Sequence, residues 1–143
     1  MHADHQAESA QEKIKEVAAK QIGKPYVYGA QGPSSFDCSG LVYYIYKKIG
    51  HPIRRLTAYL YSKIGRPVNG KLEPGDIIVV NGGEHVVMFV GDGTVISAPY
   101  TGSSVRYVPL SRYTHDIYAV RRVLKKSYAP DPKVKGKPKK GKK

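Results

Sequence analysis

The stretch "SFDCSGLVYYIY" at residues 35–46 holds the only cysteine of the 143-residue chain, Cys38. The apolar residues behind it recur at helical spacing, and Asp37 or Ser35 ahead of it is a residue type that caps helices. The pattern predicts a helix that begins near Cys38 and ends at Ile49. The thiol would then lie in the first turn, where unpaired N–H groups and the helix dipole stabilise a thiolate.

A lone cysteine has few roles open to it. It cannot form an internal disulfide, and a structural zinc site needs about four ligands, usually in closely spaced pairs. The histidines show no such pairing with it; they stand at positions 2, 5, 51, 85 and 115. Two interpretations of Cys38 remain: a buried apolar filler, which is common for free cysteine, or a nucleophile with a lowered pKa.

The rest of the body changes from helical to strand patterns. Ser9–Ile22 has apolar residues at helical spacing, with "SAQE" as a capping box that places Ser9 at the N-cap. A third, shorter helix is expected over about Thr57–Ile64. Short β-branched and aromatic runs separated by turn residues follow: "DIIVV", "HVVMFVG", "TVISA", "SVRYVPL" and "IYAVRRV". Helices followed by an antiparallel meander predict an α+β fold.

Charge and composition predict a flexible N-terminus (1–8), a folded domain (9–124) and a disordered tail (125–143). The tail has nine lysines against one aspartate, +8 of the net +13, and almost no large apolar residues. It is either an electrostatic attachment to an anionic wall polymer or membrane surface, or a solubilising segment. It lacks interleaved aromatic residues, which argues against specific nucleic-acid binding. No run of about 20 apolar residues predicts a membrane span, and the N-terminus has no signal-peptide core.

A nucleophilic cysteine needs a base, and His85 is the best placed histidine. It opens the strongly β run "HVVMFVGDGTVISA", so it lies at a strand start that can face a helix N-terminus. On its own this is weak, because a histidine at a strand edge is more often structural.

Three segments taken together are more specific. "GKPYVYGAQGPSSFDCSGLVYYIYKKIG", "LEPGDIIVV" and "HVVMFVGDGTVISAP" resemble, in order and spacing, the NlpC family of papain-like cell-wall cysteine peptidases. The resemblance covers about residues 10–124. It implies a papain-like NlpC-type fold, with N-terminal helices packed on a small antiparallel β-sheet.

The resemblance also implies roles for individual residues. Cys38 matches the nucleophile, His85 the general base, and Tyr26 the tyrosine whose hydroxyl helps to hold the oxyanion. The residue that orients the imidazole is usually a histidine twelve positions after the base, but Ser97 stands there in this chain. A serine hydroxyl can hydrogen-bond to the ring, yet it is neutral and short. We therefore expect a Cys-His dyad oriented by Ser97.

Four more residues are implied to bind substrate. Asp37 and Ser39 match the pair that flanks the nucleophile in the groove, and Arg55 and Thr57 fall in a looser match to a Pro-Arg-Ser/Thr segment. The implied activity is hydrolysis of stem peptides of bacterial peptidoglycan at γ-D-glutamyl–diamino acid bonds. We expect a monomer that acts outside the cell, in the cell wall or in the periplasm. Delivery by a phage or by injection is included in this expectation. No metal or organic cofactor is implied.

Other functions stay open at this point. A catalytically silent wall-binding module of the same fold is the first alternative, and low reactivity of the Cys38 thiol would favour it. An amidase or acyltransferase acting through the same dyad is the second, and the substrate groove would decide.

Overall fold

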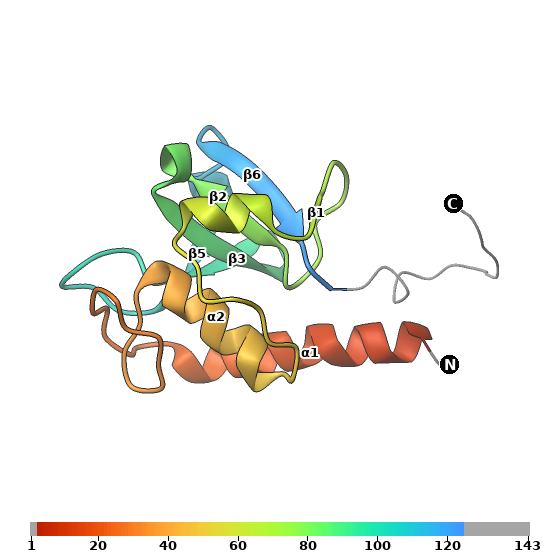
Figure 1. The fold of residues 1–143 in the computed structure, drawn as a ribbon, viewed down its shortest axis with the longest axis horizontal. Coiled ribbons are helices and arrows are strands. Elements are labelled where there is room, and N and C mark those ends of the chain that lie inside the picture. Colours follow the sequence, from red (N-terminus) through yellow and green to blue (C-terminus); the bar gives the residue numbers. More distant parts are fainter. Residues whose placement is uncertain (1–2, 125–143) are drawn as a thin grey trace.

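The computed structural model describes residues 3–124, with side chains from Ala10 onward. Two α-helices, α1 (Ala3–Gln21) and α2 (Cys38–Lys48), come first. They pack against each other and lie together on one side of the sheet (Figure 1). A 3₁₀ turn, η1 (Tyr59–Lys63), connects this helical part to the strands.

A six-stranded antiparallel sheet forms the second layer. Its strands run in the spatial order β1-β6-β2-β3-β4-β5. Strands β2 (Ile77–Val80), β3 (His85–Gly91), β4 (Thr94–Ser97) and β5 (Arg106–Pro109) form a meander that ends at the β5 edge. On the other side of β2, β6 (Ile117–Arg122) pairs with it and β1 (Arg66–Pro67) forms the second edge. Two 3₁₀ turns, η2 (Asn81–Gly83) and η3 (Leu110–Arg112), lie between strands.

Both faces of the sheet are covered by apolar side chains. Because strand residues alternate between faces, Ile77 and Val79 pack in the core between the sheet and the helices. Their neighbours Ile78 and Val80 pack in a smaller cluster on the opposite face. All four residues of β2 are buried, so this strand is the centre of the domain.

The predicted α+β architecture is confirmed, with local corrections. The first helix begins at Ala3, so residues 3–8, expected to belong to a flexible N-terminus, are helical, and Ser9 lies inside the helix instead of at its N-cap. The third helix is only the 3₁₀ turn Tyr59–Lys63, because the chain becomes extended at Ile64. The sequence did not indicate β1, which has two residues, or the return of β6 to the side of β2. The tail at 125–143 lies outside the described residues.

Candidate active site

The N-terminus of α2 is fixed by the carboxylate of Asp37. This residue is the N-cap, and its Oδ1 accepts a hydrogen bond from the Gly40 backbone N–H at 2.7 Å. Its Oδ2 accepts from the Gly29 N–H at 2.8 Å, which ties the preceding loop to the helix. A Cβ on Gly40 would lie 2.0 Å from the carbonyl oxygen of Ala30, so only glycine allows this close packing. The motif Asp-Cys-Ser-Gly thus holds Cys38 at a rigid helix start.

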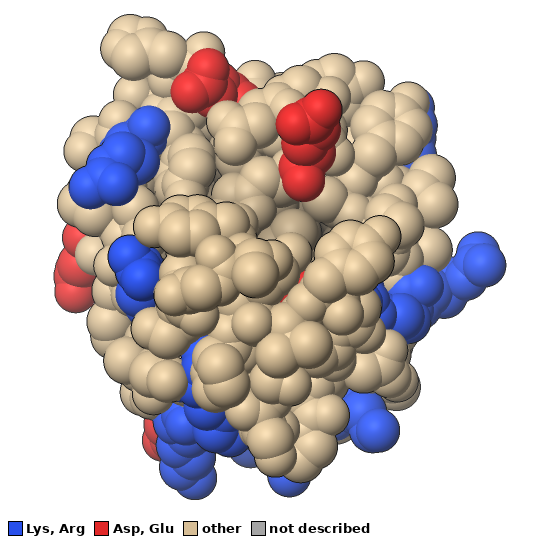
Figure 2. Space-filling model, turned by 90° about the vertical axis from the view of Figure 1, so that its left-hand side faces the viewer, with Lys and Arg blue, Asp and Glu red and all other residues tan. Residues whose placement is uncertain are grey.

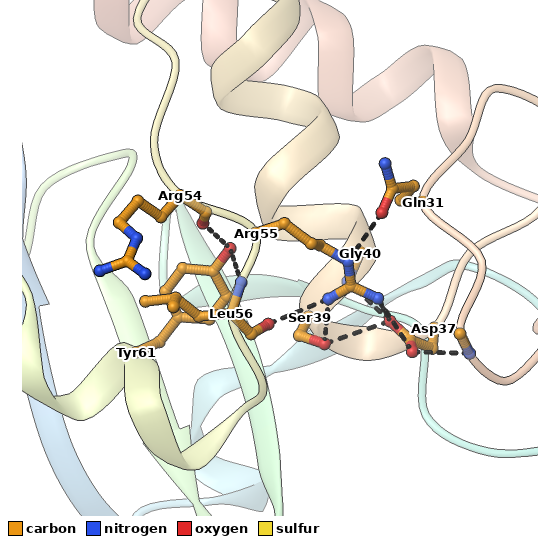
Figure 3. A network of polar contacts seen from close by, with 9 residues as sticks. Gln31, Asp37, Ser39, Gly40, Arg54, Arg55, Leu56 and Tyr61 are labelled. Atoms are coloured by element: carbon orange, nitrogen blue, oxygen red, sulfur yellow. Dashed lines mark hydrogen bonds and ion pairs between the residues drawn. The ribbon is translucent and has the colours of Figure 1, made fainter.

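Arg55 reaches from the loop after α2 across this helix end (Figure 3). Its Nη2 forms an ion pair with Asp37 Oδ1 at 3.2 Å, and its Nη1 donates to Ser39 Oγ at 2.7 Å. The Ser39 hydroxyl in turn donates to Asp37 Oδ1 at 3.2 Å. Asp37 and Ser39 are both buried, so the positive charge of Arg55 offsets a carboxylate that water does not solvate.

The backbone that presents Arg55 is itself held in place. The buried hydroxyl of Tyr61 donates to the carbonyl oxygen of Arg54 at 2.9 Å, and burial raises the pKa of Tyr61 to about 12. The guanidinium of Arg54 points away from the Asp37 network (Figure 3). Arg55 is therefore aimed at Asp37 by the fold, whereas its neighbour is not.

Cys38 is the first residue of α2 and is partly exposed. Burial raises the pKa of its thiol, and the charge of Asp37 adds to the rise, against the stabilising effect of the backbone N–H groups of Val86 and Ser39. The sequence predicted a lowered pKa from the helix dipole. This prediction is wrong for the resting structure, because loss of hydration outweighs the helix N-terminus.

His85 begins β3 and is 8% exposed. Burial lowers the pKa of its imidazole to about 4, so the ring is neutral at pH 7. Its Nε2 lies 3.0 Å from the Oγ of Ser97, which is 0% exposed. If Nε2 carries the proton and donates to Ser97, the lone pair on Nδ1 is free to accept a proton. Ser97 is thus placed to fix the tautomer of the ring.

Tyr26 belongs to the loop before α2, and its backbone N–H donates to the carbonyl of Ser103 at 3.0 Å. The pKa of Tyr26 is raised by burial first and then by the neighbouring Cys38 and Asp37. The hydroxyl therefore stays protonated at neutral pH and can donate a hydrogen bond. Such a donor stabilises a negative oxygen that develops beside the thiol.

These three groups share one cavity of about 450 Å³. Its lining includes residues from the start of α2, the η2 turn, the 98–105 loop, β5 and η3. The start of α2 lies on the left-hand side of Figure 1. Figure 2 shows the face on that side: its middle is largely uncharged, acidic side chains lie in its upper part, and basic side chains lie around its sides and lower edge. The residues that line the cavity are Tyr26, Cys38, Asn81, Glu84, His85, Pro99, Tyr100, Arg106, Val108, Arg112 and Tyr113.

The structure separates the predicted site residues into two groups. Cys38, His85 and Tyr26 line the cavity, and Ser97 lies directly behind His85. Asp37 and Ser39, which flank Cys38 in the chain, are bonded to each other and to Arg55, and none of these three is among the lining residues. Thr57 is exposed and is not among the lining residues.

Sequence reasoning missed the cavity-lining residues that come from β5, from η3 and from the position after η3. Arg106 begins β5, and Arg112 ends η3. Tyr113 follows, with its ring centroid 6.0 Å from that of His85. The pairing of β4 with β5 brings this part of the chain to the site, and no local sequence motif predicts that pairing.

Among the side chains that the structure describes, from Ala10 to Leu124, no group of three or more His, Cys, Asp or Glu is arranged to hold a metal ion. Between residues 3 and 124, no helix has both the length and the apolar character needed to cross a membrane.

Comparison with known proteins gives consistent matches. The sequence model of the NlpC/P60 family matches residues 23–123. A probable endopeptidase of Corynebacterium glutamicum is 39% identical over 109 residues, covering 72% of this chain and 52% of the relative. The peptidoglycan endopeptidase RipA of Mycolicibacterium smegmatis is 31% identical over 118 residues, covering 72% of this chain and 24% of the relative.

The fold has solved counterparts as well. The structure of the peptidoglycan hydrolase RipB from Mycobacterium tuberculosis superimposes with a TM-score of 0.72 at 29% identity, covering 83% of this chain and 67% of that chain. The chain spans about half the length, or less, of the curated relatives named above.

Proposed function

Because the chain belongs to the NlpC/P60 family, we propose that it is an endopeptidase that hydrolyses the stem peptides of bacterial peptidoglycan. The observation that carries the proposal is the grouping of Cys38, His85 and Tyr26 around one cavity, with Ser97 at the distal nitrogen of the imidazole. We further propose that the bond cleaved joins γ-D-glutamate to the following diamino acid. The enzyme would act in the cell wall, the periplasm or the extracellular space.

The reaction is an acyl transfer that starts from a neutral thiol and a neutral imidazole. Nδ1 of His85 takes the proton of Cys38 as the sulfur attacks the scissile carbonyl carbon. The Tyr26 hydroxyl and the backbone N–H of Cys38 donate to the oxygen that becomes negative. The tetrahedral intermediate collapses when the imidazolium gives its proton to the leaving amine, which breaks the C–N bond and leaves a thioester. Water, deprotonated by His85, hydrolyses this thioester and restores the thiol.

Ser97 serves the base in both protonation states. Its oxygen accepts the Nε2–H of the neutral ring and of the imidazolium, so the ring orientation is kept through the proton transfers. The hydroxyl is neutral and stabilises the imidazolium less than a charged partner would. Ser97 is therefore a positioning residue.

Asp37, Ser39, Arg55 and Thr57 are proposed to contribute to substrate binding. The first three are bonded to one another at the start of α2, where Asp37 and Ser39 lie on either side of Cys38, which supports a role in shaping the groove and holding the nucleophile. The Lys-rich tail is proposed to attach the enzyme to an anionic wall polymer. The enzyme is proposed to act as a monomer without specific nucleic-acid binding.

The proposal is tested by digesting purified peptidoglycan with the wild type and with Cys38→Ala and identifying the products by mass. The wild type should release fragments ending in γ-D-glutamate, and the variant should release none while unfolding at a similar temperature, since alanine fits a helix start. Release of the same fragments by the variant would refute the mechanism.

A second candidate, a catalytically silent wall-binding module, is favoured by one observation. The raised pKa of Cys38 leaves the thiol protonated and weakly nucleophilic at rest. The digestion of peptidoglycan distinguishes the two functions. If the protein is a silent module, neither the wild type nor Cys38→Ala should cleave peptidoglycan, and both should bind it with the same affinity.

A further inference from the structure

Two arginines line the wall of the cavity that β5 and η3 form. Arg106 and Arg112 are both exposed, and neither forms an ion pair with a carboxylate among residues 10–124. The Nε of Arg106 donates to the carbonyl of Ser104 at 3.3 Å, which orients the guanidinium. Glu84 is the single acidic residue of the lining, so this wall carries a net positive charge.

Both arginines lie close to the catalytic base. Arg106 is the direct partner of Ser97 in the β4–β5 register, and side chains of paired residues point to the same face of a sheet. The Ser97 hydroxyl contacts the imidazole of His85. Arg112 precedes Tyr113, whose ring packs near the same imidazole. Each arginine is thus one residue removed from a direct neighbour of His85.

The position beside His85 has a chemical meaning. The imidazole must reach the leaving nitrogen to protonate it, so side chains next to the imidazole face the leaving half of the substrate. His85 is neutral at pH 7, and therefore the positive charge of this wall comes from the arginines. A guanidinium prefers a planar carboxylate, which it binds with two parallel hydrogen bonds.

We propose that Arg106 and Arg112 bind a carboxylate carried by the leaving diamino acid. The enzyme then selects stem peptides whose diamino acid is a diaminopimelate with a free side-chain carboxylate. Peptides with the amide of that carboxylate, or with lysine, which lacks it, are poorer substrates. The inference rests on the proposed function, because it takes the stem peptide as the substrate.

The test uses tetrapeptides L-Ala-γ-D-Glu-X-D-Ala in which X is diaminopimelate, its side-chain amide or lysine. Wild type should cleave the free diaminopimelate peptide with a kcat/KM about tenfold above the other two, the gain expected of one charge-assisted hydrogen bond. Arg106→Gln and Arg112→Gln should each lower kcat/KM more for the free diaminopimelate peptide than for the amidated peptide, and so reduce this preference. Arg54→Gln, which removes the same charge from an exposed side chain outside the cavity lining, is the matched control and should keep the preference.

A separate binding measurement keeps the inference distinct from the proposed function. Calorimetric titration of Cys38→Ala with the free and amidated peptides should show tighter binding of the free form, and the difference should disappear when Arg106→Gln and Arg112→Gln are added. Failure of the wild type to cleave any peptide would refute the proposed function, and the titration would still decide the inference. Equal affinities of the free and amidated peptides, or a difference in affinity that persists after both arginines are replaced, would overturn the inference.

Discussion

Replacing Ser97 with alanine tests how the imidazole is oriented. The substitution removes the oxygen that lies 3.0 Å from His85 Nε2 and changes little else, because alanine is smaller by a single heavy atom. Ser97 is fully buried and His85 is 8% exposed, so water has little access to replace the lost partner. The ring nitrogen would be left unsatisfied, and the ring could turn or exchange its proton to Nδ1.

The expected cost follows from that burial. A buried polar group that loses its partner costs about 1–3 kcal/mol. If the loss applies to the transition state, in which the imidazolium needs the acceptor most, kcat/KM falls roughly ten- to a hundredfold. KM should change little, since Ser97 does not line the cavity.

The assay is single-substrate kinetics on a soluble stem peptide, with thermal unfolding measured in parallel. Ser62→Ala is the matched control: it removes another buried serine hydroxyl, which donates to the Tyr59 carbonyl at 2.6 Å, and should lower stability without lowering kcat. Ser97→His restores the usual family residue and should keep or raise kcat. The same variant should lower the free energy of unfolding by about 1–3 kcal/mol, because the larger side chain overpacks a fully buried position. A kcat for Ser97→Ala within twofold of wild type would show that Ser97 does not orient the ring.

Three further predictions concern charge. Burial lowers the pKa of His85 from 6.5 to about 4, so between these pH values the unfolded chain binds more protons than the folded one. The free energy of unfolding of the wild type should therefore fall by about 3 kcal/mol from pH 6.5 to pH 4, relative to the change in His85→Gln, when both are measured by urea unfolding. Arg55→Gln should lower the free energy of unfolding by on the order of 3 kcal/mol in the same assay, because it leaves Asp37 buried and unpaired. Lys15→Gln, which removes an exposed ion pair, should lower it little, and equal losses in the two variants would contradict a stabilising Asp37–Arg55 network. Deleting 125–143 should leave turnover of soluble peptides unchanged and weaken wall binding in a pelleting assay at low salt, and equal pelleting would mark the tail as a solubiliser.

The residues that sequence reasoning could place are those governed by local rules. Asp37 caps α2 because a carboxylate at an N-cap satisfies free backbone N–H groups, and this rule together with the helical spacing of the apolar residues that follow placed Cys38 in the first helical turn. His85 at the start of β3 follows from the continuous β-branched and apolar run behind it. The separation of twelve residues between His85 and Ser97 carries the chain through the β3–β4 hairpin and back to the imidazole.

Long-range packing decides the properties that the sequence could not predict. The pKa of Cys38 depends on how much water the β3 strand and the Tyr26 loop exclude from the thiol, and no helix-dipole rule contains that information. Arg55 matched a substrate-groove segment, but its hydrogen bonds go to Asp37 and Ser39. The cavity wall with Arg106 exists only because β5 pairs with β4.

The opposite pKa shifts of Cys38 and His85 have one origin, burial, and one consequence for catalysis. A thiolate-imidazolium pair is disfavoured at rest because both charges would be poorly hydrated. The thiol should therefore react slowly with small electrophiles that cannot use the rest of the cavity. In the proposed mechanism a bound amide differs, because its carbonyl oxygen would take up the negative charge next to the Tyr26 hydroxyl as the proton moves to His85. The cavity would then stabilise charge only when a substrate is in place, which would make the proposed nucleophile selective where a free thiolate is not.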